Sequence, residues 1–439
     1  MEILVKAAQL ILSLSILVMV HELGHFFFAR LFKTRVEKFY LFFNPWFSLF
    51  KKKIGDTEWG IGWLPLGGYV KISGMIDESM DKEQMKLPAQ PHEFRSKSTW
   101  QRLLIMLGGI IVNVVFAFVV YSMILFAWGE QYLPTSEAKY GIMVDSTGTK
   151  MGLLNGDKIL SVDGKYVENF RKIGHDILVN EAKTIEVERN GEKTTVTIPD
   201  GIRSELIKSP GFIEVRIPFV ILDFAKESIG KDAGLKAGDK VVAFNHAPIQ
   251  FYDEVRTNLR LAKNKDVVIT VLRGADSVDV NVKVPETALL GIAVDTDMEK
   301  YFKLKKLEYG FFESFPAGFN KTFSMLDSYI KQFKLLFSKE TKAYESLGGF
   351  IKIGSFFPGV WDWYSFWTMT AFLSIILAFM NLLPIPALDG GHVLFLLYEI
   401  ITRRKPNEKF MEYAQIGGMI IIFALLLFAN GNDIIGLFR

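Results

Sequence analysis

Apolar residues gather in four long segments of the chain, at about Ile3–Leu31, Leu103–Trp128, Phe366–Leu388 and Ala414–Asn430. The second segment contains no charged residue. At a rise of ~1.5 Å per residue, a helix of this length crosses a hydrocarbon core of ~30 Å. The pattern therefore predicts a polytopic α-helical membrane protein with about four transmembrane helices. The stretch Gly391–Ile401 either extends the third span or forms a re-entrant piece.

The first segment has the position of a secretory signal peptide, but it is too long for one. No small-residue cleavage site accompanies it, and the residues HELGHFFFARLF stand at its end instead. We therefore expect a retained transmembrane helix.

Basic residues are unevenly distributed around these spans. They cluster in the loop 32–102, which includes Lys51, Lys52 and Lys53, and in the loop 391–413, which includes Arg403 and Arg404. Because basic loops stay on the cytoplasmic side, we expect both loops there, with region 129–365 and both termini on the opposite side. The first and third spans then end at the same membrane face.

Residues 129–300 read as soluble and contain an internal repeat. The run MGLLNGDKI from Met151 aligns with AGLKAGDKV from Ala233. Each copy predicts short alternating strands, a Gly-Asp turn and one helix, near Phe170–Asn180 and Tyr252–Ala262. This favours two tandem α+β domains inserted between the second and third spans.

The segment Phe311–Phe337 carries aromatic residues at helical spacing, interrupted by charges. It predicts either an amphipathic helix on the outer membrane surface or an ordinary packing helix. The expected organisation is a first membrane half at 1–128, domains at 129–205 and 206–300, this helix with a linker at 301–365, and a second membrane half at 366–439.

Composition narrows the chemistry. The formal net charge of +3 is close to balance and does not suggest nucleic-acid binding. The chain has no Cys, which excludes disulfides, thiolate metal sites and cysteine nucleophiles. With six His in the chain, a metal site would be built from His, Asp and Glu.

The first span contains an HExxH motif, formed by His21, Glu22 and His25. On a helix, residues four apart share a face, so both imidazoles can bind one ion. Catalytic zinc sites hold three protein ligands and an open position, and the Glu can act as general base. On a surface helix this motif can arise by chance. Inside an apolar helix, ionisable residues are costly, so their presence here indicates a functional site.

Asp389, at the end of the third span, is the best candidate for a third ligand. Pro384 and Pro386 should break the helix just before it. A helix-end cap is the alternative role for Asp389. His392 is a rival ligand or a supporting residue, although it follows Gly390 and Gly391.

The remaining His and two Asn residues are weaker candidates. His92 fits a loop, and His175 and His246 fit surface or packing positions in the repeats. Asn113 suits an inter-helix hydrogen bond. Asn381 has two alternative roles. It makes such a bond, or it binds the unwound backbone of a peptide substrate and stabilises the oxyanion that forms when the peptide bond is attacked.

The Gly-rich run Trp59–Lys71 alternates small and large apolar residues. It predicts either a hairpin that dips into the membrane beside the metal or a surface loop with two interfacial Trp. A hairpin would offer an edge, near Gly67, Gly68 and Tyr69, to an extended substrate strand.

Together, HELGH in the first span, LPLGGYVK, the tandem repeat and NLLPIPALDGG resemble the site-2 protease family, in particular its bacterial RseP-type branch. The resemblance covers nearly the whole chain. It implies zinc ligands at His21, His25 and Asp389, a catalytic base at Glu22, the conserved-motif Asn at Asn381, and a membrane re-entrant hairpin at Gly60–Lys71.

The resemblance also implies two PDZ domains that face the periplasm and gate access. It implies a multi-pass protein of the bacterial inner membrane, with its active site toward the cytoplasm. Expected substrates are transmembrane segments already trimmed by another protease, from anti-sigma factors and remnant signal peptides.

The sequence departs from a peptide-binding PDZ domain in one respect. The first copy offers the carboxylate-loop candidate Tyr140–Met143, whereas the second has Ile217–Val220 without Gly, so both copies could act as a steric filter instead.

Two other classes remain as alternatives. A membrane scaffold or chaperone would bind partners through the repeats and keep a vestigial metal site. A metal transporter would need several spans with paired acidic residues, and the sequence has no such series.

Overall fold

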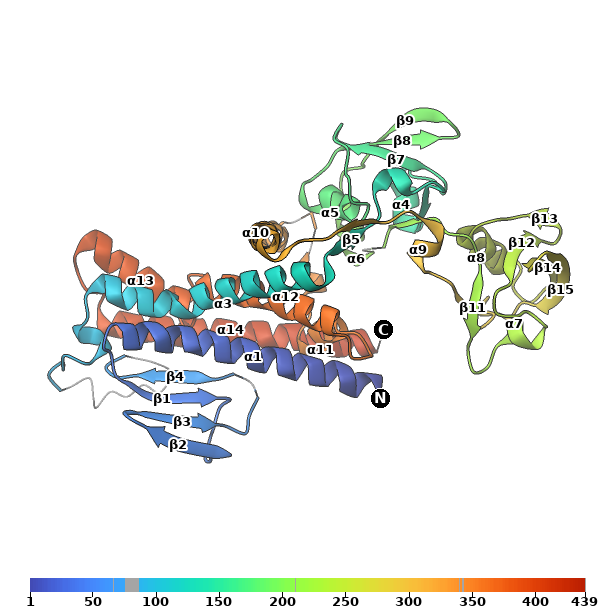
Figure 1. The fold of residues 1–439 in the computed structure, drawn as a ribbon. Coiled ribbons are helices and arrows are strands. Elements are labelled where there is room, and N and C mark those ends of the chain that lie inside the picture. Colours follow the sequence, from blue (N-terminus) through green and yellow to red (C-terminus); the bar gives the residue numbers. More distant parts are fainter. Residues whose placement is uncertain (66, 76–86, 210, 339, 342, 439) are drawn as a thin grey trace. The chain divides into compact units, whose positions relative to one another are not determined.

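The computed structural model describes residues 1–65, 67–75, 87–209, 211–338, 340–341 and 343–438. The chain divides into two compact units (Figure 1). The first unit comprises Met1–Gly129, Glu308–Phe333 and Tyr344–Arg439. The second comprises Glu130–Leu307 and Lys334–Ala343.

Four helices of the first unit are long and apolar enough to cross a membrane, in agreement with the predicted spans. They are α1 (Glu2–Leu31), α3 (Thr99–Trp128), α12 (Trp363–Leu382) and α14 (Glu408–Leu437). Helix α12 ends before the predicted Leu388, because Pro384 and Pro386 cannot continue it. The stretch Gly391–Ile401 belongs to a separate helix, α13 (Asp389–Thr402).

Helix α3 is the central element of this unit and packs against α1, α12 and α13. Ser98 begins it with a capping box, in which the Ser98 hydroxyl accepts from the Gln101 amide. Its buried side includes Ala117, Tyr121 and Ile124, which pack with Ala371 of α12. Shorter helices of this unit are η1 (Phe94–Ser96) and α11 (Phe350–Ser355), and η3 (Ala343–Ser346) begins at the last residue of the second unit.

A four-stranded sheet flanks α1 (Figure 1). Its strands are β1 (Val36–Leu41), β2 (Phe50–Ile54), β3 (Thr57–Ile61) and β4 (Tyr69–Ile72), in the order β2-β3-β1-β4. The segment predicted as a hairpin does not form one, because its two strands, β3 and β4, do not pair with each other. Strands β3 and β4 both pair with β1, parallel and antiparallel respectively, so β1 lies between them. Leu66, in the same predicted segment, lies outside the described residues.

Helix α10 (Phe311–Leu335) combines features of both predicted alternatives. Phe315 and Phe319 contact Phe118 of α3, and Tyr329 contacts Phe379 of α12. Phe312 on the same helix is 84% exposed. The helix therefore packs on the bundle and still presents an aromatic surface outward.

The second unit contains two hydrophobic cores, each built around one copy of the repeat. The first copy contributes β5 (Glu130–Tyr132), η2 (Thr135–Glu137), β6 (Ile142–Val144), α4 (Ser146–Lys150), β7 (Lys158–Val162), α5 (Lys172–Val179), β8 (Thr184–Arg189), β9 (Glu192–Thr197), α6 (Arg203–Lys208) and β10 (Ile213–Val215). The second contributes β11 (Ile221–Phe224), α7 (Ile229–Asp232), β12 (Lys240–Phe244), β13 (Ala247–Pro248), α8 (Tyr252–Leu261), β14 (Asp266–Arg273), β15 (Asp276–Lys283) and β16 (Ile292–Val294), followed by α9 (Met298–Tyr301) and β17 (Lys305–Leu307).

The two copies repeat the same pattern of pairing. Sheet β7-β8-β9 corresponds to β12-β14-β15 of the four-stranded sheet β13-β12-β14-β15, and β10-β6 corresponds to β16-β11. The predicted helices are found as α5 and α8. The alternating burial along β14 and β15 explains the period-two pattern of their sequences.

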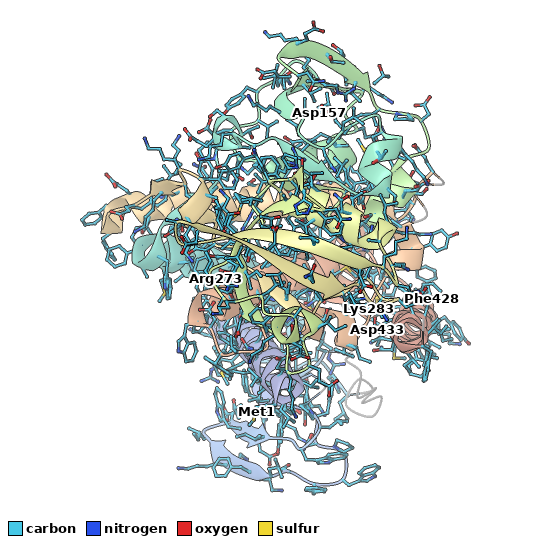
Figure 2. The ribbon with its side chains drawn as sticks, turned by 90° about the vertical axis from the view of Figure 1, so that its right-hand side faces the viewer. Met1, Asp157, Arg273, Lys283, Phe428 and Asp433 are labelled. Atoms are coloured by element: carbon cyan, nitrogen blue, oxygen red, sulfur yellow. The ribbon has the colours of Figure 1, made fainter. Side chains whose placement is uncertain are left out.

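Each Gly-Asp turn is held by the same ionic arrangement. In the second copy, Arg273 donates two hydrogen bonds to the buried Asp239 and one to the Gly234 carbonyl. In the first, Arg189 does the same to Asp157 and Gly152. Asp157 and Arg273 are labelled in Figure 2.

Burial opposes the ionisation of Asp239, but hydrogen bonds from Arg273 and from the Lys236 amide outweigh it and hold the pKa of Asp239 below its ordinary value. Because this pKa is lowered in the folded state, the stabilisation is present at neutral pH. It is lost as the pH falls through the folded pKa.

We expect Arg273→Met to leave the Asp239 carboxylate buried without its partner, which destabilises the second copy by about 3–5 kcal/mol. Hydrogen exchange of β12 and β14 in the intact protein should be faster at neutral pH. Lys283→Met, on the exposed end of β15 (Figure 2), is the matched control and should leave exchange unchanged. Equal exchange in both variants would contradict this role of the ion pair.

Candidate metal centre

Helix α1 places His21 and His25 one turn apart on its buried side. Both residues are buried, and their Nε2 atoms lie 3.2 Å apart. The same stripe of α1 carries Gln9, Ser13 and Leu17 toward the interior, while the opposite face carries exposed Leu12, Met19 and Leu23. The HExxH motif therefore faces the inside of the bundle.

Asp389 reaches the same point from a distant part of the chain. The break at Pro384 and Pro386 ends α12, and the backbone turns through Ala387 at a positive φ of 87°. Asp389 then starts α13. Its Oδ2 lies 3.1 Å from His21 Nε2 and 3.3 Å from His25 Nε2.

These three atoms fit a zinc ion. Tetrahedral zinc with bonds of ~2.0–2.1 Å to N and O separates its ligand atoms by about 3.3 Å. Oδ2 of Asp389 is buried and has no hydrogen-bond partner among the described residues. A carboxylate oxygen left without a hydrogen bond beside two imidazole nitrogens is well explained by a cation that binds all three. No other such convergence of three His, Asp or Glu side chains occurs in the described part of the chain.

Contacts behind the ligands orient the two rings. His25 Nδ1 donates to the Ile105 carbonyl of α3 at 2.8 Å, which leaves Nε2 free as a ligand atom. His21 Nδ1 lies 3.2 Å from the side-chain amide of Asn113, also on α3. Asn381 Nδ2 lies 3.3 Å from His21 Nε2, on the ligand side of the ring.

Glycines allow α3 to approach these rings. A Cβ added at Gly109 would lie 2.5 Å from His21 Cε1 and 2.6 Å from His25 Nε2. Gly24 and Gly108 bring the two backbones together, since a Cβ on Gly24 would lie 2.3 Å from the Gly108 carbonyl oxygen. Sequence reasoning did not single out these glycines as part of the site. The signal available was a Gly108-Gly109 pair in an otherwise bulky apolar span.

The predicted base and substrate-binding residues lie on neighbouring surfaces. Glu22 is half-buried, and a Cβ added at Gly68 would lie 3.6 Å from its Cγ. Tyr69 begins β4, which packs against α1. Gly67 precedes it with a positive φ of 151°. The structure thus brings Gly68 and the start of β4 beside the HExxH helix.

His392 is not part of the converging set. It lines a separate cavity of about 240 Å³ together with Arg102, Glu399 and Phe395. His92 lies in an exposed loop and His246 is an exposed turn residue with a positive φ. His175 is half-buried beside Asp176. The Nε2 of His175 has no hydrogen-bond partner in the described structure.

We expect Gly109→Ala to weaken zinc binding by about 10- to 100-fold, because the added methyl displaces both imidazoles. Alanine is a better helix former than glycine, so a loss through helix propensity is not expected. Zinc affinity is measured by chelator competition on the purified protein. Gly417→Ala, in α14, is the matched control because its Cβ would meet no atom within 4 Å. A Gly109→Ala protein with unchanged affinity would show that the close approach is not required.

Comparison with known proteins identifies the family of the chain. The model of peptidase family M50 matches residues 9–425. The chain is 28% identical to a Vibrio cholerae protein named "Putative zinc metalloprotease", over 98% of this chain and 99% of that protein. It is 26% identical to the Regulator of sigma E protease of Haemophilus influenzae, over 100% of both. It is 25% identical to Metalloprotease MmpA of Caulobacter vibrioides, over 98% and 96%. With four candidate membrane helices and this family match, the chain belongs to peptidase family M50, the site-2 proteases, and is a membrane zinc metallopeptidase.

Proposed function

We propose that this protein is an intramembrane endopeptidase that cleaves transmembrane segments of single-pass proteins. The observation that carries the proposal is the convergence of His21, His25 and Asp389 at 3.1–3.3 Å, on or next to helices long enough to span a bilayer. Burying such groups in an apolar environment is costly and is expected only where they have a function.

In this proposal His21, His25 and Asp389 hold the zinc ion. Bound zinc supplies Lewis acidity, which activates water near neutral pH and polarises a carbonyl. Glu22 follows His21 directly and takes the proton of the attacking water. It then delivers that proton to the leaving amine.

Asn381 is proposed to stabilise the developing oxyanion. Its side-chain amide lies on the ligand side of His21, at 3.3 Å from Nε2. It follows the apolar part of α12 and precedes the proline break, so its side chain is held by a helix end next to the ligands. A donor held in this place would strengthen its hydrogen bond as negative charge develops on the substrate oxygen.

The edge of the sheet at β4 is the proposed substrate-binding surface, with Gly67, Gly68 and Tyr69 at its start. β4 is an outer strand of its sheet and lies against α1. An unwound substrate can add to such an edge through main-chain hydrogen bonds. Gly68 has no room for a side chain, because a Cβ would lie 2.6 Å from the Tyr40 carbonyl oxygen. The described residues of the segment from Gly60 to Lys71 would then re-enter the membrane together with the ends of β3 and β4.

The two repeat copies are proposed to be PDZ-like domains, at 129–205 and 206–300, that filter substrates by size. In the first copy, the Gly141 amide donates to the Ala138 carbonyl and the Ile142 amide to the Asp157 carbonyl. These amides of the candidate carboxylate loop are therefore already occupied, which favours the filter over capture of a peptide carboxyl end.

We place the protein in the bacterial inner membrane, with the metal centre toward the cytoplasm and the repeat domains in the periplasm. Basic residues in the 32–102 and 391–413 loops support this orientation. Substrates of this class include anti-sigma factors and remnant signal peptides already trimmed by another protease. The name of the Haemophilus influenzae relative supports a link to regulated intramembrane proteolysis.

We expect Glu22→Gln to abolish cleavage of a purified transmembrane peptide and to retain about one zinc per chain. Asp389→Ala should lose both, because a ligand rather than the base is removed. Glu2→Gln, at the exposed start of α1, serves as the control for removing a carboxylate from this helix. Cleavage by the Glu22→Gln protein would exclude Glu22 as the base. A wild-type protein without zinc and without cleavage would favour a scaffold.

A second experiment tests the substrate edge, using the absence of native Cys in the chain. In a Glu22→Gln background, Val70→Cys on β4 should form a disulfide with a single Cys near the scissile bond of the substrate peptide. Lys52→Cys, on the outer strand β2 at the other edge of the sheet, is the matched control and should not cross-link. Equal cross-linking at both positions would reject β4 as the specific binding edge.

A further inference from the structure

Asn113 is a fully buried polar residue in the most apolar span of the chain. It projects from α3 toward the back of His21, where its Nδ2 lies 3.2 Å from the ring Nδ1. Its side-chain oxygen is buried and has no hydrogen-bond partner among the described residues. A fully buried amide with an unused acceptor is costly and calls for an explanation.

The protonation of the His21 imidazole offers an explanation for the unused oxygen of Asn113. His21 presents Nε2 to Asp389 and to His25, so Nε2 is the atom available to a metal. A neutral imidazole that binds through Nε2 carries its proton on Nδ1. That Nδ1–H would then face the amide NH₂ of Asn113, which is also a donor. A half-turn of the Asn113 amide exchanges its nearly isosteric nitrogen and oxygen. The donor–donor contact then becomes a hydrogen bond from Nδ1–H to the oxygen, and the NH₂ takes the place of the unused oxygen.

We propose that Asn113 is a positioning residue of the metal centre. Its side-chain oxygen accepts the Nδ1–H of His21 and thereby sets the tautomer and the orientation of that ring. This inference rests on the proposed role of His21 as a zinc ligand. Helix α3 then supports both rings in the same way, through the Ile105 carbonyl for His25 and the Asn113 amide for His21.

The surrounding contacts separate this role from ordinary inter-helix bonding. The backbone carbonyl of Asn113 accepts from the buried Ser374 hydroxyl of α12 at 2.8 Å, which fixes the position of the residue. Another buried pair, Thr370 with Ser13 at 3.0 Å, joins α12 to α1 away from the ligands. In the described structure, the side chain of Asn113 has its one polar contact with His21.

The test compares zinc affinity in three variants of the full-length protein in detergent, by chelator competition. Asn113→Leu keeps the approximate size but has no acceptor, and we expect about 10- to 100-fold weaker zinc binding. Asn113→Asp keeps an acceptor oxygen and should stay within about threefold of wild type. Thr370→Val removes an inter-helix hydrogen bond that does not touch His21 and should leave the affinity unchanged.

The visible spectrum of the cobalt-substituted protein is a second readout, because it reports ligand geometry independently of turnover. It should change in Asn113→Leu and remain like wild type in Asn113→Asp and Thr370→Val. Wild-type affinity and spectrum in Asn113→Leu would overturn the proposal, as would equal losses in the Leu and Asp variants. If Asn113→Leu does not fold, Asn113→Ala removes the same acceptor and takes its place, with the same expected losses and the same two controls. Equal zinc binding by wild type and His21→Ala would instead reject the metal site itself.

Discussion

The close crossing of α1 and α3 is the constraint on which the rest of the membrane unit depends. Two imidazoles buried inside a hydrophobic bundle need hydrogen-bond partners at their second nitrogens, because an unpaired buried polar group is costly. A neighbouring helix at short range can supply these partners, from its backbone or from a polar side chain. The glycines at 24, 108 and 109 make that approach possible, since a Cβ at any of them would lie within 2.6 Å of an atom of the opposing helix. The Ile105 carbonyl can then accept from His25, and Asn113 can contact His21.

A second constraint, the break in the chain after α12, places the Asp389 carboxylate beside the two His side chains. A continuous third span would carry Asp389 beyond the ligands, so the helix must stop and restart. The prolines break it, and the following glycines allow the chain to fold back on itself: a Cβ at Gly390 would lie 2.1 Å from the Leu383 carbonyl oxygen, and one at Gly391 would lie 2.5 Å from Pro386 Cα. Helix α14 covers the turn through Gly418, whose Cβ would meet the Pro386 carbonyl oxygen. Helix α14, whose apolar side chains are mostly exposed, therefore approaches the turn before Asp389 closely at Gly418.

Much of this arrangement could be predicted from local patterns. The spans follow from apolar length, and the His pair from helical periodicity. The candidate third ligand follows from the coincidence of an acidic residue, prolines and glycines at one predicted membrane face. The pairing of β1 between β3 and β4 could not be predicted, because a parallel β1–β3 pair depends on long-range packing against α1 rather than on turn sequence. The role of Gly109 was missed for a related reason. A glycine is informative only once the atoms facing it are known, and those atoms lie on another span.

The two edges of the sheet differ in a way that bears on where a substrate strand can add. Strand β2 is exposed along its whole length and carries Lys51, Lys52 and Lys53. Consecutive lysines on an outer strand discourage pairing with another chain, because the added strand would bring the ammonium groups out of water. On β4, by contrast, the charge of Lys71 is close to that of Glu37 at 3.6 Å, and the strand packs against α1. The edge that is chemically open to pairing is therefore also the edge next to Glu22. A strand added there would lie beside the HExxH helix α1, whereas one added at β2 would be separated from it by the width of the sheet.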